Sequence, residues 1–157
     1  MLELMMAGDL GKKLMAAITP HLPKVEGAQK PGKIVIGSSK GDIHDIGKNV
    51  VITQLQLAGF EVFDLGVDVP SMTFVDKARE TGADIIAMSA FLTTTMAYFS
   101  EVINYLKDMG LRDKYRVIVG GGTTDAAFAE SIDADGTAPD AIQAVKLCQN
   151  LIAMKKG

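Results

Sequence analysis

The residues best suited to chemistry stand in one polar loop, at positions 38–49. The loop holds His44, one of only two histidines in the chain, and Asp42 precedes this histidine by two residues. In extended backbone, side chains two residues apart point the same way. The Asp42 carboxylate can therefore accept the imidazole N–H and leave the other ring nitrogen ready to bind a metal, as carboxylates do beside many metal-bound histidines.

His44 can also be read as an ordinary surface-loop histidine, which composition alone favours. The other histidine, His21, lies between Pro20 and Pro23, and we interpret it as a solvated linker residue. A structural zinc site needs about four His or Cys ligands, and this chain cannot supply them with two histidines and one cysteine. A single histidine suits a metal that brings its own equatorial ligands.

Two other kinds of site do not fit this sequence. The loop resembles a phosphate-binding P-loop from Gly41 to Lys48, but five residues separate its glycines. Asn49 also stands where Ser or Thr would bind magnesium. The receiver domain of a response regulator needs an aspartate at the end of its third strand, where this chain has Ser89.

Short apolar runs alternate with segments of helical period from residue 33 onward. The first three runs are nearly continuous in apolar residues, as strands buried on both faces require. The expected strands are 33–37, 60–65, 84–89, 116–120 and a weak 134–137. The expected helices are 47–58, 71–81, 94–109, 124–131 and 139–154.

Five strand-and-helix units joined by short loops predict an α/β fold. We expect a doubly wound, five-stranded parallel sheet of the Rossmann or flavodoxin-like type, with helices on both faces. The expected strand order is 2-1-3-4-5. Ligands bind such folds at the carboxyl ends of the strands, beside the switch point between the first and third. The loop at 38–49 lies at this edge.

The composition limits the partners and the compartment. A net charge of −3 and a pI near 5.3 argue against nucleic acid. No apolar run approaches the roughly 20 residues that cross a bilayer, and the N-terminus lacks the features of a secretory signal. The single cysteine, Cys148, is expected to be a small packed hydrophobe. We expect a cytoplasmic protein without a membrane partner.

Three motifs carry a resemblance to a known family. The loop contains the Asp-x-His-x-x-Gly motif of cobalamin-binding domains, as Asp42-Ile43-His44-Asp45-Ile46-Gly47. Residues 89–91 resemble the family's Ser-x-Leu, with phenylalanine in place of leucine, and residues 120–121 resemble its paired glycines. Each motif lies at the carboxyl end of an expected strand, and the resemblance covers about residues 30–155.

Within this family the chain is similar to the corrinoid proteins of methanol, methylamine and aryl methyl-ether methyltransferases, and to the cobalamin domain of methionine synthase. Residues 41–49, 64–70 and 89–96 carry the likeness. It implies a cobalamin (cobalt corrinoid) cofactor whose dimethylbenzimidazole tail leaves cobalt and enters the domain. It also implies a non-catalytic methyl carrier, served by a methyl-donor-specific methyltransferase and a methyl-acceptor methyltransferase, with a reductive activase as a further candidate partner.

The resemblance also implies which residues meet the cofactor. Ser89, Thr93 and Thr95 offer hydroxyls to the tail or to Asp42, and Thr95 aligns with the serine of the His–Asp–Ser relay in methionine synthase. Paired glycines let a bulky tail pass close to the backbone. The expected contacts are Asp42, His44, Asp45, Ile46, Gly47, Ser89, Phe91, Thr93, Thr95, Gly120, Gly121 and Gly122, with His44 as the metal ligand.

Two other functions share the cobalamin motif, namely a cobalamin-responsive sensor and the small subunit of a cobalamin-dependent mutase. We divide the chain into an N-terminal helical segment and linker, 1–32, and a cobalamin-binding domain, 33–157. Relatives usually carry a helical bundle before this domain, where only about 30 residues precede the first strand here. The N-terminal segment is rich in methionine (Met1, Met5, Met6 and Met15). We expect it either to pack as a remnant helix on its own domain, or to build a homodimer or dock a methyltransferase.

Overall fold

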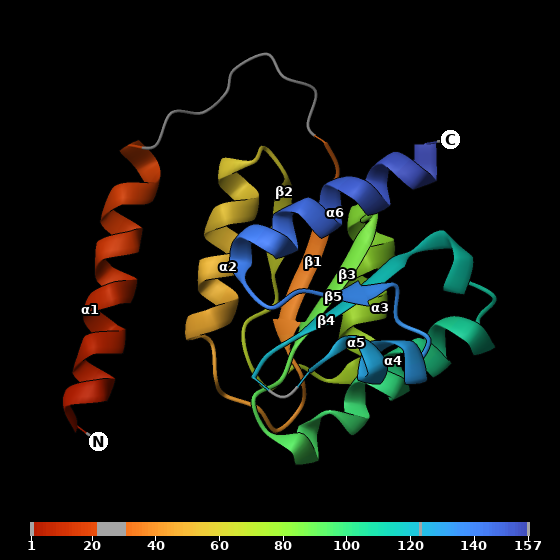
Figure 1. Cartoon of the computed structure of the whole chain (residues 1–157), viewed down its shortest axis with the longest axis horizontal. Helices are drawn as coiled ribbons and strands as arrows, with labels where there is room; N and C mark the ends of the chain where they lie inside the picture. Colours follow the sequence, from red (N-terminus) through yellow and green to blue (C-terminus); the bar gives the residue numbers. More distant parts are fainter. Residues whose placement is uncertain (1, 22–30, 123, 157) are drawn as a thin grey trace.

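One parallel sheet organises the protein, which was studied as a computed structural model that describes residues 2–21, 31–122 and 124–156. Its strand order, β2-β1-β3-β4-β5, confirms the flavodoxin-like prediction (Figure 1). Every expected strand is present, although β2, β3 and β5 are shorter than predicted. The strands are β1 (Lys33–Ser38), β2 (Glu61–Asp64), β3 (Ile85–Ser89), β4 (Arg116–Gly120) and β5 (Gly136–Thr137).

Helices cover both faces of the sheet (Figure 1). One face packs against α2 (Ile46–Leu57) and α6 (Ala141–Lys156), and the other packs against α3 (Ser71–Thr81), α4 (Ala97–Asp108) and α5 (Ala126–Ser131). The helix expected at 94–109 begins only at Ala97, because Thr93–Thr95 form a separate 3-10 turn. The chain is thus doubly wound, with the two helical layers predicted from the alternating pattern.

The buried strands feed two cores, one on each face of the sheet. Along β1, Val35 packs toward the side of α3 and α4, whereas Ile34 and Ile36 pack toward α2 and α6. This alternation follows from the pleat of a strand, which sends successive side chains to opposite faces. Cys148 is fully buried in the second core, and burial raises the pKa of its thiol to about 12. The prediction of a small, packed cysteine is confirmed.

The N-terminal segment contains a helix that ends before Pro20. It spans α1 (Leu2–Ile18) and continues into a 3-10 turn, η1 (Thr19–His21). The apolar side chains that the structure describes on α1 are exposed, namely Met6, Leu10, Leu14 and Ile18. His21 is exposed as well. Met1, the side chains of Met5 and Met15, and residues 22–30 of the expected linker lie outside the described residues.

No helix among the described residues is both long and apolar enough to cross a membrane.

A close backbone approach joins the ends of β3 and β4. Gly121 has φ +122°, and a Cβ at this position would overlap the carbonyl oxygen of Ala90. The Ala90 N–H donates to the Gly120 carbonyl at 3.0 Å. Gly120 has no heavy atom within 4 Å of a Cβ built on it. Position 121 therefore requires glycine for the fold, and position 120 does not.

We expect Gly121→Ala to lower the free energy of unfolding by about 3 kcal/mol, because the methyl group meets backbone and the φ angle is unfavourable for L residues. The matched control, Gly120→Ala, should change it by less than about 1 kcal/mol. Urea unfolding of the two variants measures both values. Equal stability of the two variants would contradict this account of the turn.

Candidate functional site

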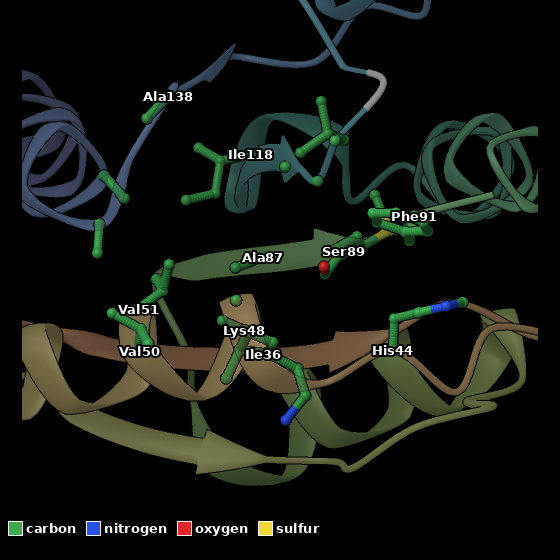
Figure 2. A pocket seen from close by; sticks show the side chains of 18 of the residues that line it. Ile36, His44, Lys48, Val50, Val51, Ala87, Ser89, Phe91, Ile118 and Ala138 are labelled. Carbon is green, nitrogen blue, oxygen red and sulfur yellow. The ribbon is translucent and has the colours of Figure 1, made fainter. Parts of the chain in front are cut away.

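The carboxyl end of the sheet opens into a cavity of about 730 Å³ (Figure 2). Ile36, Ala87 and Ile118, from β1, β3 and β4, line it on the sheet side. Val51 from α2 and Leu147 from α6 line it on the helical side. These residues also belong to or pack on the core between the sheet and these helices. The cavity is a continuation of the core, with the size and apolar lining of a cofactor site.

Large apolar side chains stand exposed among the residues that line this cavity. Ile43 is 74% exposed, Ile46 is 60% exposed and Phe91 is 55% exposed. Soluble proteins seldom leave such side chains grouped in water unless a ligand or partner covers them. The exposed apolar side chains at the mouth of the cavity therefore indicate that a ligand or partner covers it.

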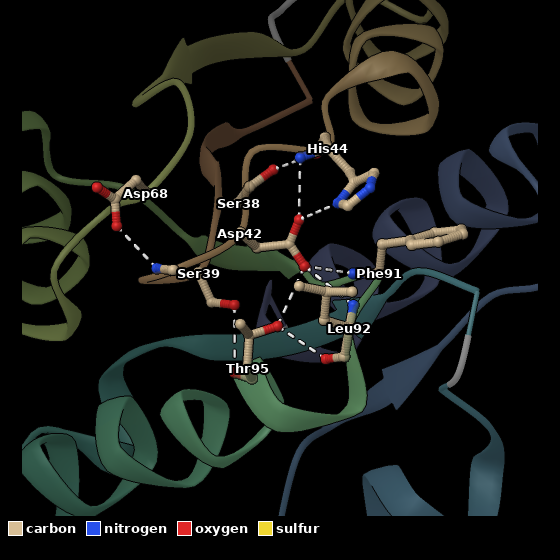
Figure 3. Close-up of polar contacts among 9 residues, drawn as sticks. Ser38, Ser39, Asp42, His44, Asp68, Phe91, Leu92 and Thr95 are labelled. Atoms are coloured by element: carbon tan, nitrogen blue, oxygen red, sulfur yellow. Dashed lines mark hydrogen bonds and ion pairs between the residues drawn. The ribbon is translucent and has the colours of Figure 1, made fainter. Parts of the chain in front are cut away.

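Asp42 lies beside this mouth, fully buried, and its carboxylate accepts five hydrogen bonds (Figure 3). Oδ1 accepts the His44 backbone N–H at 2.9 Å and contacts the imidazole Nδ1 at 2.8 Å. Oδ2 accepts the N–H groups of Phe91 at 2.6 Å and Leu92 at 3.1 Å, and the Thr95 hydroxyl at 3.1 Å. The predicted contact between Asp42 and His44 is present, and Asp42 also joins the ends of β1 and β3.

These contacts set the charge of Asp42. Burial alone would raise the pKa of this carboxyl, since it penalises the charged form. The backbone N–H groups of His44, Phe91 and Leu92, together with the imidazole, outweigh burial and hold the pKa well below its usual range. The carboxylate therefore stays ionised beside His44 throughout the physiological range.

His44 is fixed on two sides and open on a third. Its Nδ1 is held by Asp42, and its ring stacks on Phe91 with centroids 4.5 Å apart and planes tilted by 31°. Ser38 donates its hydroxyl to the His44 carbonyl at 2.8 Å. The side chain is 48% exposed and lines the cavity, and among the described residues Nε2 has no hydrogen-bond partner. The arrangement presents Nε2 to a ligand.

The structure brings most of the sequence-predicted site residues to the cavity and separates three from it. Asp42 and Thr95 lie behind His44, in its hydrogen-bond network. Thr93 is exposed and is not among the cavity-lining residues. Those that line the cavity are His44, Asp45, Ile46, Gly47, Ser89, Phe91, Gly120, Gly121 and Gly122.

Sequence reasoning missed the cavity wall contributed by the C-terminal part of the chain. Ala138, Ala141 and Ala144 line the cavity at three-residue spacing, and Leu147 continues the series. Ala141, Ala144 and Leu147 lie on one face of α6, and small residues at helical spacing indicate a face that something approaches closely, which is the signal that could have identified them. The missed cavity-lining residues are Ile36, Ile43, Lys48, Val50, Val51, Ala87, Met88, Ile118, Val119, Ala138, Pro139, Asp140, Ala141, Ala144 and Leu147.

Lys48 lines the cavity, but its ammonium group is paired with residues outside the lining. Its side chain is 1% exposed, and Nζ bonds the Asp64 carboxylate at 2.8 Å and the Asn49 amide oxygen at 2.9 Å. The positive charge of Lys48 is therefore paired with the carboxylate of Asp64 at the end of β2. A P-loop lysine would instead be directed at a phosphate, so this pairing agrees with the exclusion of a P-loop. Within residues 2–21, 31–122 and 124–156, no three His, Cys, Asp or Glu side chains gather as a metal site. In the part of the chain that the structure describes, His44 thus belongs to no multi-ligand metal cluster.

Comparison with known proteins identifies the family. The model of the B12 binding domain matches residues 32–146. A corrinoid protein of Desulfitobacterium hafniense is 47% identical over 153 residues, covering 96% of this chain and 70% of that protein. Dimethylamine corrinoid protein 3 of Methanosarcina mazei is 45% identical over 151 residues, covering 96% of this chain and 90% of that protein.

Solved structures agree. The monomethylamine corrinoid protein of Methanosarcina barkeri superposes with a TM-score of 0.84 at 33% identity, covering 96% of this chain and 71% of that chain. The receiver domain of a Mycobacterium tuberculosis response regulator reaches a TM-score of 0.58 at 15% identity, over 80% of this chain and 98% of that chain, which reflects the shared fold alone. The chain belongs to the B12-binding domain family, as a corrinoid protein of methyltransferase systems.

Proposed function

We propose that this corrinoid protein holds cobalamin with its tail in the cavity and His44 as the lower ligand, and that it carries a methyl group between two methyltransferases. One observation carries the proposal. A histidine fixed through Nδ1 by a buried, ionised carboxylate presents Nε2 beside a cofactor-sized apolar cavity. Neighbouring carboxylates hold metal-bound histidines in this way.

The residues present fit this cofactor. A corrin ring brings its own equatorial ligands, so one protein nitrogen suffices, and the described residues offer no multi-ligand metal cluster. Ile36, Ala87 and Ile118 give the cavity apolar walls for an aromatic tail, and Gly120 leaves its entrance open. When bound, the corrinoid supplies a cobalt centre that can accept and release a methyl group.

The protein's own groups hold this centre in place. Asp42 keeps the imidazole in one tautomer and orientation, and the Thr95 hydroxyl fixes Asp42 in turn. The exposed apolar side chains of Ile43 and Phe91 would cover a corrin face and exclude water from His44. In this proposal residues 33–157 bind the cofactor, with the predicted contacts in the loops after β1, β3 and β4.

The partners follow from the relatives by analogy. One structural neighbour belongs to the methanol:cobalamin methyltransferase complex of Methanosarcina barkeri, with a TM-score of 0.74 at 28% identity over 98% of this chain and 58% of that chain. We propose a methyl-donor-specific and a methyl-acceptor methyltransferase as partners. The segment 1–32, with Leu10 and Leu14 exposed on α1, would contact such a partner or a second copy of the chain.

The protein should bind cobalamin on reconstitution. We expect the coloured cofactor to comigrate with the chain through gel filtration, because tail insertion buries a large apolar surface. Absorbance at visible wavelengths across the protein peak measures retention. A colourless peak after reconstitution under both reducing and oxidising conditions would refute cobalamin binding by this chain.

His44→Ala should remove the lower ligand while leaving tail binding largely intact. We expect the variant to retain cobalamin and to lose the nitrogen superhyperfine splitting in the electron paramagnetic resonance spectrum of the cobalt(II) form. The matched control is His21→Ala, which removes the only other histidine and should leave the splitting unchanged. Persistent splitting in His44→Ala would exclude His44 as the ligand.

Filling the cavity should block the tail. Ala141→Phe places a ring among the lining residues of α6, whereas Gln143→Phe alters an exposed, non-lining position on the same helix. We expect Ala141→Phe to weaken cobalamin binding at least about tenfold, or about 1.4 kcal/mol, and the control to bind normally. Equilibrium titration followed by visible absorbance distinguishes them. Equal affinities would show that the tail does not use this cavity.

A further inference from the structure

A second loop lies against the His44 loop and holds its backbone. The segment between β2 and α3 runs parallel to the residues after β1, and Ser39 and Val69 form an isolated bridge. Within this segment, Asp68 makes two hydrogen bonds to the backbone of the His44 loop. Its N–H donates to the Asp42 carbonyl at 2.9 Å. Its carboxylate accepts the Gly41 N–H at 2.7 Å, which is the dashed line at Asp68 in Figure 3.

Asp68 makes these contacts in an unusual conformation. Its φ is +51°, in the left-handed region, and Asp133 is the only other non-glycine residue with positive φ among the described residues. Asp and Asn tolerate this region better than other residues with a side chain. The Asp68 carboxylate is exposed, so core packing does not explain the residue. Unfavourable backbone angles retained outside the core point to a positional requirement.

The two contacts fix the backbone of Asp42, whose carboxylate holds His44 through Nδ1. Asp68 holds the Asp42 carbonyl and the Gly41 N–H, while the Asp42 carboxylate is held by the turn after β3. Any shift of the 41–42 backbone would move Oδ1, which contacts the His44 imidazole at 2.8 Å. The main chain and the side chain of Asp42 are thereby anchored to different loops.

We propose that Asp68 is a positioning residue that clamps the Gly41–Asp42 backbone and so keeps His44 in the ligating orientation. This inference rests on the proposed role of His44 and extends it to the loop after β2. The clamp acts on the protein before any cofactor binds, so it can be measured with and without cobalamin.

Three variants distinguish the effect of the Asp68 carboxylate from the effect of its backbone conformation. Asp68→Gly accepts a left-handed φ and removes the acceptor for Gly41, whereas Asp68→Asn tolerates the same φ and keeps an acceptor oxygen. Asp133→Gly is the matched control, because it changes the other left-handed aspartate, which bonds Lys107 far from the loop. The full chain is used throughout.

The first readout is amide hydrogen exchange at Gly41 in the cofactor-free protein. We expect at least tenfold faster exchange in Asp68→Gly, and rates near wild type in Asp68→Asn and Asp133→Gly, because local opening governs exchange. The second is the fraction of cobalt(II) protein with nitrogen superhyperfine splitting. We expect this fraction to fall in Asp68→Gly alone.

Each outcome decides the proposal. Wild-type exchange at Gly41 together with an unchanged split fraction in Asp68→Gly would overturn it. A loss of His44 ligation in Asp68→Asn equal to that in Asp68→Gly would also overturn it, since the acceptor would then be irrelevant. If the wild type binds no cobalamin or shows no nitrogen splitting, the proposed function fails instead, and Gly41 exchange still tests the clamp.

Discussion

The buried carboxylate of Asp42 is the constraint on which the site depends. A carboxylate with no exposed surface would cost several kcal/mol if its oxygens lacked partners. Five hydrogen bonds from two loops offset that cost, and each of them fixes the position of its donor. The strands β1 and β3 lie side by side in the sheet, and the Asp42 carboxylate joins the loops that follow them.

The hydrogen bonds of Asp42 explain how the structure can hold a cavity beside them. A void that continues a core lacks the contacts that normally stabilise its walls. Here the entrance is held by hydrogen bonds around Asp42 and by the approach of Gly121 to Ala90, rather than by side chains that fill the space. Polar contacts outside the cavity thus fix its entrance, while the apolar residues that line it remain part of the core.

The sequence predicted what local pattern encodes. Buried strands and helical period predicted the α/β layers, and the Asp42–His44 spacing predicted the central hydrogen bond. The strand order 2-1-3-4-5 was expected from the flavodoxin-like fold type and not from periodicity. The helical period did not predict that Thr95 would lie in a 3-10 turn before α4, where its hydroxyl donates to Asp42 across 53 positions. Sequence reasoning missed the wall formed by Ala141 and Ala144, because small residues at helical spacing indicate a close approach but do not distinguish a packed neighbour from a cavity.

Phe91, which stands in place of the family's leucine, contributes to the site separately through its backbone and through its side chain. The bond from Phe91 to Asp42 uses the backbone N–H, so the carboxylate is satisfied whatever side chain stands there. The ring acts separately, because it stacks on the imidazole and lies against Gly122, where a Cβ would sit 3.4 Å from it. Position 91 therefore keeps the buried charge through its main chain and adjusts the orientation of His44 through its side chain. A different side chain at position 91 would therefore change the packing on the His44 ring and leave the hydrogen bond to Asp42 in place.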